Sequence, residues 1–203
     1  MTTMYKRKDS YYLKAKQEGY RSRAAYKLQQ IVVAEKIVKP GDLVVDAGAA
    51  PGGWSQLLLQ MVGAKGKVAA VDILAMDPLG GDNFRFYHQS LEEPALPAEV
   101  IGFLGRKADL VLSDAAPNTT GSAFTDQARS ADLVRIIFGF ARETLKPGGA
   151  FLAKIFTGNE SDLVFKELQP HFDKVRRIRP EATRKESFEL YLIGKGFKGY
   201  RPL

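Results

Sequence analysis

The chain of 203 residues is long enough for one domain with a sizeable core, and 45% of its residues are hydrophobic. It contains no cysteine, which excludes disulfides, thiolate metal sites and cysteine nucleophiles, and its two histidines lie far apart without ligand-like spacing. The net charge of +7 favours a polyanionic partner, although a basic surface without such a partner accounts for the charge equally well.

The beginning of the chain is rich in lysine, arginine and tyrosine. We expect residues 1–20 to form a basic N-terminal arm and residues 21–203 to form one folded domain. A helix is predicted from about Ser22 to Val38, because apolar residues recur there at helical spacing before Pro40 and Gly41. No apolar run has the length of a membrane span, and the first residues lack the apolar stretch of a signal peptide, so a cytoplasmic protein is expected.

From Leu43 onward, short apolar runs alternate with helical segments. Strands are predicted over residues 43–48, 67–74, 84–89, 108–114, 150–156, 174–180 and 189–196, and helices over 54–62, 98–105, 127–145 and 162–172. This alternation indicates a Rossmann-like α/β fold with a mainly parallel seven-stranded sheet covered on both faces. The link between the last two strands, PEATRKESF, is too short for a crossover helix, so we expect an antiparallel hairpin at one edge.

A glycine-rich turn, DAGAAPGGW at residues 46–54, follows the first strand and opens a helix. Small residues in this context let a cofactor approach the backbone at the carboxyl edge of a sheet. Ala50 replaces the glycine that would admit a pyrophosphate closely, while Asp72, at the end of the next strand, is placed to accept hydrogen bonds from ribose hydroxyls. We therefore predict a nucleoside-cofactor site lined by Gly48, Gly52, Gly53, Trp54 and Asp72. The alternative is a tight turn with a helix-capping acid.

Two charged residues on later strands need an explanation. Asp114 leaves a buried strand at the carboxyl edge, where ligands collect, although it could equally be a turn or capping residue. Lys154 lies between apolar neighbours in AFLAKIF, and a lysine is costly to bury without a partner. We expect Lys154 to have acidic partners and a functional role. The alternative is that its side chain extends back to solvent.

Several segments together resemble one known family. RSRAAYKL, DAGAAPGGWSQ, VDILAMDP, LSDAAPN, AKIF and SFELY have the order and spacing of the FtsJ (RrmJ, RlmE) family of ribosomal RNA 2′-O-ribose methyltransferases. The resemblance covers nearly all the chain from about Tyr11. It implies the S-adenosylmethionine-dependent methyltransferase fold, with an antiparallel last strand. It also implies a catalytic tetrad of Lys27, Asp114, Lys154 and Glu189, with Asp114 also near the donor methyl.

The chain departs from the family at His88-Gln89, where members typically carry Gly-Asp with the acid near the adenine. The carbonyl of Gln89 can still accept a hydrogen bond from the adenine amine, so Gln89 is predicted as a weaker cofactor contact. An ordinary polar residue at a strand end explains Gln89 nearly as well.

Methyl transfer to a ribose hydroxyl needs in-line positioning of the oxygen and help in losing its proton. Lys154 is predicted either to remove that proton or to orient the oxygen as an ammonium, and the residues leave both roles open. Asp114 and Glu189 are predicted to hold the side chains of the two lysines in position. This chemistry requires no metal.

Basic residues flank the predicted pocket on both sides in the sequence. For RNA binding we single out Arg21, Arg23, Arg184 and Lys185, because phosphates around a splayed nucleotide are held by such side chains. A solvated basic surface is the alternative for any one of them.

The resemblance implies methylation of large-subunit ribosomal RNA, with a uridine in the peptidyl-transferase A-loop as target and RNA within assembled particles as substrate. We expect a monomer that acts without a membrane. The alternatives are a ribose methyltransferase for transfer RNA or messenger caps, an NAD-dependent dehydrogenase, and a non-catalytic RNA chaperone of the same fold.

Overall fold

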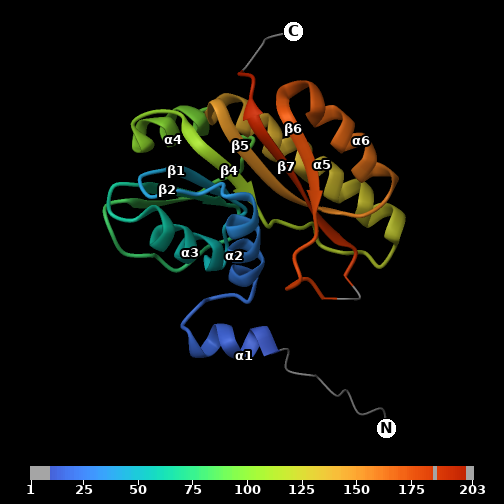
Figure 1. Cartoon of the computed structure of the whole chain (residues 1–203), viewed down its shortest axis with the longest axis horizontal. Helices are drawn as coiled ribbons and strands as arrows, with labels where there is room; N and C mark the ends of the chain where they lie inside the picture. The colour runs from blue at the N-terminus through green and yellow to red at the C-terminus, as the bar shows by residue number, and fades with distance from the viewer. Residues whose placement is uncertain (1–9, 185–186, 200–203) are drawn as a thin grey trace.

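A computed structural model describes residues 10–184 and 187–199. Helices and strands alternate along most of this part of the chain (Figure 1). The helices are α1 (Ser10–Gln17), α2 (Ala24–Glu35), α3 (Gly53–Val62), α4 (Leu96–Leu104), α5 (Ala123–Thr144) and α6 (Asn159–Leu168), and the 3₁₀ helix Gln169–His171 follows α6. The strands are β1 (Leu43–Ala47), β2 (Lys67–Asp72), β3 (Phe84–His88), β4 (Ala108–Ser113), β5 (Leu145–Phe156), β6 (Phe172–Ile178) and β7 (Glu189–Phe197). Among the described residues, no helix is long and apolar enough to cross a membrane.

The strands form one sheet in the order β3-β2-β1-β4-β5-β7-β6. Strands β1 to β5 pair in parallel, whereas β7 runs antiparallel to both β5 and β6. The predicted α/β fold and the terminal hairpin are therefore confirmed, with β6 at the edge and β7 inside the sheet. Because β7 is reversed, its amino end lies at the same sheet edge as the carboxyl ends of β1 to β5.

Helices cover both faces of the sheet, as Figure 1 shows. Strand side chains alternate between the faces, so Val45 and Ala47 pack with residues of α4, α5 and α6, whereas Val44 packs with residues of α2 and α3. Each face thus has its own hydrophobic core. The helix layers on both faces hold the strand ends in place, and the polar residues of the candidate site lie at these ends.

Several helix ends differ from the sequence-based boundaries by one to four residues, and two of the differences have a clear local cause. Helix α2 ends at Glu35, before the predicted Val38, because Lys36 adopts the left-handed conformation with φ 52° and its N–H bonds the carbonyl of Val32. Helix α5 begins about one turn before the predicted residue 127, because Ser122 caps it.

Part of the predicted arm is helical. Ala15 of α1 is buried with Tyr26 of α2 and Ala182 of the β6–β7 connection, and Tyr11 packs against the ring of Tyr26. The division of the chain at residue 20 stays a prediction, but the described end of the arm contacts the domain.

Candidate active site

The four residues of the predicted tetrad come from four elements. Lys27 lies on α2, Asp114 directly follows β4, Lys154 is in β5 and Glu189 opens β7. In the antiparallel β5–β7 ladder Lys154 faces Tyr191, and Phe156 faces Glu189. Lys154 and Glu189 therefore point to the same face of the sheet, which is the face that α2 covers.

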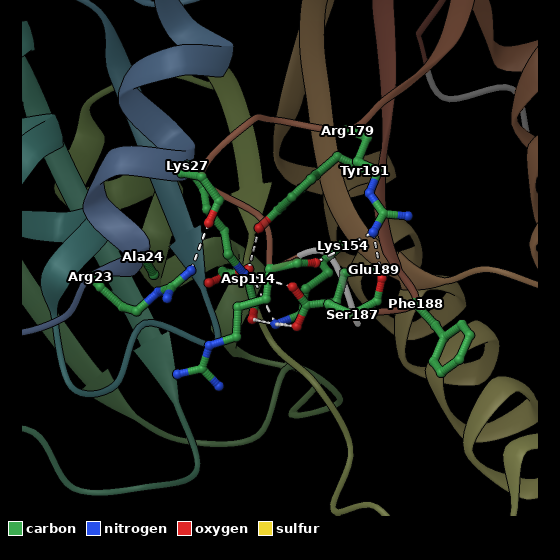
Figure 2. A network of polar contacts seen from close by, with 12 residues as sticks. Arg23, Ala24, Lys27, Asp114, Lys154, Arg179, Ser187, Phe188, Glu189 and Tyr191 are labelled. Carbon is green, nitrogen blue, oxygen red and sulfur yellow. Dashed lines mark hydrogen bonds and ion pairs between the residues drawn. The ribbon is translucent and has the colours of Figure 1, made fainter. Parts of the chain in front are cut away.

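The structure brings all four side chains together (Figure 2). Nζ of Lys27 donates to Oε2 of Glu189 at 2.7 Å. Nζ of Lys154 lies 3.2 Å from Oδ1 of Asp114 and 4.0 Å from Oε1 of Glu189, and it donates to the backbone carbonyl of Asp114 at 2.5 Å. Both lysine side chains are at least 90% buried. The lysines and carboxylates thus form one network in which each lysine has an acidic partner.

Tyr191 is a member of this network that the sequence analysis missed. Its hydroxyl donates to Oδ1 of Asp114 at 2.6 Å, and its ring is fully buried and stacked on Trp54 at 5.9 Å. The signal was available, because in a strand the residue two positions after Glu189 points to the same face. Tyr191 fixes the carboxylate that also faces Lys154.

The network shifts two pKa values in opposite directions. Burial raises the pKa of Glu189, but the hydrogen bond and charge of Lys27, with the charge of Lys154, outweigh burial and hold this pKa below its usual value. Burial and the neighbouring carboxylate of Asp114 raise the pKa of Tyr191 well above its usual value. At neutral pH, Glu189 is a carboxylate and Tyr191 is a neutral hydrogen-bond donor.

The glycine-rich turn lies beside this network. A narrow cavity of about 50 Å³ is lined by residues of the turn, by Ser22 and Ala24 at the start of α2, and by Asp114. Gly48, Gly53 and Trp54 belong to its lining, whereas Gly52, with φ 102°, packs against Met76 and Arg21. The indole of Trp54 donates to the carbonyl of Ala24 at 2.8 Å, so the turn and α2 are held together.

Asp72 and Gln89 lie farther along the same sheet edge, at the ends of β2 and β3. Both oxygens of Asp72 accept backbone N–H groups at 2.8 Å, one from Ala50 and one from Leu74. Gln89 is half-buried and lines a wider cavity of about 450 Å³, as does Ile73. The ends of β4, β1, β2 and β3 follow one another, so Asp114 and Gln89 are separated by three inter-strand steps, or roughly 14 Å.

Asp46 is a buried acid in this cleft that the sequence analysis did not single out. It is 1% exposed, and Oδ2 accepts the hydroxyl of Ser55 at 2.6 Å. Burial raises the pKa of Asp46 to about 7, the charges of Asp114 and Asp72 add to this effect, and the Ser55 hydrogen bond opposes it.

We expect Asp46 to make the cofactor-free protein less stable as the pH rises from about 4 to about 7. In this window the folded state holds a proton that the unfolded chain releases, so the free energy of unfolding falls by up to about 1.4 kcal/mol per pH unit. Asp46→Asn should remove this slope. Between pH 5 and pH 7 the free energy of unfolding of the variant should therefore rise by about 2–3 kcal/mol relative to that of the wild type. Urea unfolding at both pH values measures the difference; parallel pH curves for the two proteins would contradict it.

A second cavity, of about 570 Å³, opens on the other side of the start of α2. It is lined by Ser22, Arg23, Ala24, Lys27, Arg184, Ser187 and Glu189. Burial and the charge of Arg184 lower the pKa of Arg23, and Glu189 opposes this shift. Arg23 and Arg184 therefore repel each other across a cavity that contains two tetrad residues.

The four residues predicted to bind RNA have different surroundings. Arg23 and Arg184 line the 570 Å³ cavity, and Arg23 also donates to the carbonyl of Ala182 at 2.6 Å. Arg21 lies beside the glycine-rich turn, and its guanidinium donates to the backbone carbonyl of Pro51 there at 3.2 Å. Lys185 lies outside the described residues. Within the described part of the chain, no group of three His, Cys, Asp or Glu side chains is arranged to hold a metal ion.

Known proteins with similar sequences and folds identify the family of this chain. Residues 20–197 match the FtsJ-like methyltransferase family. The chain belongs to this family. The resemblance seen in the sequence is thereby confirmed.

Relatives cover almost the whole chain. A protein named ribosomal RNA large subunit methyltransferase E from Chromohalobacter salexigens is 47% identical over 94% of this chain and 90% of its own length. A protein of the same name from Methanothermobacter thermautotrophicus is 44% identical over 96% and 92%. A solved structure of a candidate ribosomal RNA methyltransferase from Plasmodium falciparum superposes with a TM-score of 0.79 at 28% identity, covering 89% of this chain and all of that one.

Proposed function

We propose that the protein transfers a methyl group from S-adenosylmethionine to a ribose 2′-hydroxyl of large-subunit ribosomal RNA, with a uridine in the peptidyl-transferase A-loop as the target. The observation that carries this proposal is the Lys27–Glu189 and Lys154–Asp114 network, which stands between a cleft lined by carboxylates and a cavity lined by arginines. The names of the relatives support ribosomal RNA as substrate. For such a substrate we infer that the enzyme works in the cytoplasm, as a monomer.

The residues of the cleft fit S-adenosylmethionine. The carboxylates of Asp46, Asp72 and Asp114 lie at the ends of three adjacent strands, and the charges of the last two raise the pKa of Asp46. Such a cluster favours a ligand with positive charges, and S-adenosylmethionine carries a sulfonium and an ammonium group. It disfavours the anionic pyrophosphate of NAD, which argues against the dehydrogenase alternative.

Along the cleft, the residues suit the parts of an extended nucleoside cofactor. Each oxygen of Asp72 has accepted one backbone N–H and retains a lone pair for a ribose hydroxyl. Gln89 and Ile73 line the wider cavity that would receive the adenine. Asp114 and the turn around Gly48 line the end nearest to Lys154, where the bound cofactor would supply an activated methyl group.

The protein's own task is to position the acceptor oxygen and to handle its proton. An ammonium has three N–H donors, and Lys154 uses two hydrogen-bonding positions on Asp114, so one donor is left for the ribose oxygen. Lys27 and Tyr191 hold Glu189 and Asp114, respectively, and thereby fix Lys154. Buried, mutually bonded side chains of this kind hold a reacting group in line without reorganisation.

The arginine-lined cavity supports an RNA substrate. Arg23 and Arg184 repel each other, and a phosphate between them would relieve that repulsion. We expect the double change Arg23→Ala with Arg184→Ala to weaken RNA binding and to reduce the slope of log affinity against log salt by about 0.7, the value for one lost phosphate contact to a single strand.

Binding to a short RNA at several salt concentrations measures that slope. Arg106→Ala with Lys65→Ala is the matched control, because these exposed cations lie at the amino edge of the sheet, away from the cavity. An unchanged slope in the cavity variant, or an equal change in the control, would count against this RNA site.

The proposed function is tested by mapping ribose methylation in cells that lack the protein and by adding purified enzyme back to their large ribosomal subunits. We expect one 2′-O-methyluridine of large-subunit RNA to disappear and to return on addition. Loss of a methyl group from transfer RNA or from a messenger cap would point to the alternative substrates. Unchanged methylation of large-subunit RNA, transfer RNA and messenger caps would support the non-catalytic chaperone instead.

A further inference from the structure

Arg21 joins two loops of the cofactor cleft. One terminal nitrogen, Nη1, donates to the carbonyls of Asp77 at 2.6 Å and Pro51 at 3.2 Å, and the other, Nη2, donates to the carbonyl of Pro78 at 3.0 Å. Pro51 belongs to the glycine-rich turn, whereas residues 77 and 78 belong to the loop between β2 and β3. One guanidinium therefore bonds two loops that leave the neighbouring strands β1 and β2.

The two loops are those that meet at Asp72. The carboxylate of Asp72 accepts N–H groups from Ala50 in the turn and from Leu74 in the β2–β3 loop. Arg21 closes the same pair of loops from the other side, where Gly52 leaves space for its guanidinium and for Met76. The conformation that presents Asp72 to a cofactor ribose thus depends on a residue outside both loops.

Arg21 is itself held against α3, the helix that the turn opens. Its backbone N–H donates to Oε1 of Gln56 at 2.8 Å, and Nε2 of Gln56 donates to the carbonyl of Gly19 at 3.2 Å. The side chain two residues later points the other way: Arg23 donates to Ala182 in the β6–β7 connection and lines the arginine-rich cavity. Ser22 and Ala24, beside Arg23, line both cavities.

We propose that Arg21 is a positioning residue that preforms the cofactor cleft and that, through residues 21–24, couples cofactor binding to RNA binding. The coupling rests on the proposed function, since it requires both ligands. A bound cofactor stabilises the arrangement of the turn that Arg21 holds, and this fixes the segment whose opposite side faces the RNA cavity. Coupling between two sites is reciprocal, so RNA should also tighten cofactor binding.

The test uses Arg21→Lys in the full chain. Lysine keeps the positive charge for long-range attraction to phosphates, but its single ammonium cannot reach the three carbonyls from two separate nitrogens. Calorimetry with S-adenosylhomocysteine should show about 10-fold weaker binding than wild type, as expected if about a tenth of the variant molecules hold the cleft in its binding-competent form. The affinity for a short RNA without cofactor should stay unchanged, whereas the gain in RNA affinity caused by saturating S-adenosylhomocysteine should disappear. Arg106→Lys, which changes an exposed arginine at the opposite sheet edge, is the control.

Hydrogen exchange of the free protein gives a readout that needs neither ligand nor activity. In Arg21→Lys the amides of Ala50 and Leu74 should exchange faster, while the amides of the β-sheet should keep wild-type rates. Wild-type affinity for S-adenosylhomocysteine together with wild-type exchange would overturn the proposal. Weaker RNA binding without cofactor, combined with wild-type cofactor binding, would also overturn it and make Arg21 a phosphate contact. Failure of the proposed function appears separately, as wild-type protein that binds neither ligand.

Discussion

Lys154→Ala should slow methyl transfer by about 100- to 10,000-fold while the protein still folds and binds S-adenosylhomocysteine. The reason is the position of its amine, which is held by both the carbonyl and the carboxylate of Asp114 at the end of the cleft nearest to the tetrad. Single-turnover rates with saturating RNA and cofactor are the measurement, because they separate the chemical step from binding and product release.

Lys195→Ala is a matched control for this change. Lys195 is also a strand lysine paired with a buried acid, at 2.7 Å from Oε2 of Glu35, but it lies toward the far end of β7. We expect Lys195→Ala to lower stability and to leave the single-turnover rate unchanged. A near-normal rate in Lys154→Ala would remove Lys154 from the reaction.

Lys154→Arg separates the two roles that the residue types leave open. A guanidinium stays protonated at working pH, so it can supply charge but cannot accept a proton. Substantial activity in Lys154→Arg, with little in Lys154→Ala, would show that Lys154 acts through its charge. Loss of activity in both variants fits a base, provided that S-adenosylhomocysteine binding is retained.

The fold could be predicted because its signals are local. Apolar runs such as LVVDA and ADLVLS form the parallel strands, and the short link before Glu189 allows only an antiparallel return. The helix ends were less predictable, since the left-handed conformation of Lys36 and the capping by Ser122 depend on single hydrogen bonds. Helix α1 was missed because its polar sequence depends on contacts of Ala15 with Tyr26 and Ala182.

The tetrad could be named from the sequence because family resemblance gave its positions, and the structure adds which lysine pairs with which acid. The contacts of Arg21 could not be predicted in this way. An arginine beside other basic residues suggests that it binds phosphates. The partners of Arg21 are instead the backbone carbonyls of Pro51, Asp77 and Pro78, and such partners cannot be inferred from the types of the residues. Contacts to main-chain atoms of distant loops appear only once the fold brings those loops together.

Asp114 should prove to have two separable roles, one in stability and one in catalysis. Asp114→Ala removes the acceptor of the buried Tyr191 hydroxyl, which should lower the free energy of unfolding by about 1–3 kcal/mol. It also removes the carboxylate beside Lys154, and misplacing the reacting amine by about 1 Å should slow methyl transfer roughly 100-fold. Urea unfolding and single-turnover rates measure the two effects.

The double variant Asp114→Ala with Tyr191→Phe tells these roles apart. Phenylalanine leaves no buried hydroxyl without an acceptor, so most of the lost stability should return, whereas the slow methyl transfer should persist because Lys154 still lacks its partner. Tyr191→Phe alone should retain most of the rate, since Asp114 keeps its contact with Lys154. If Tyr191→Phe is as slow as Asp114→Ala, or if the double variant regains the wild-type rate, the carboxylate acts in catalysis through Tyr191 and not through Lys154.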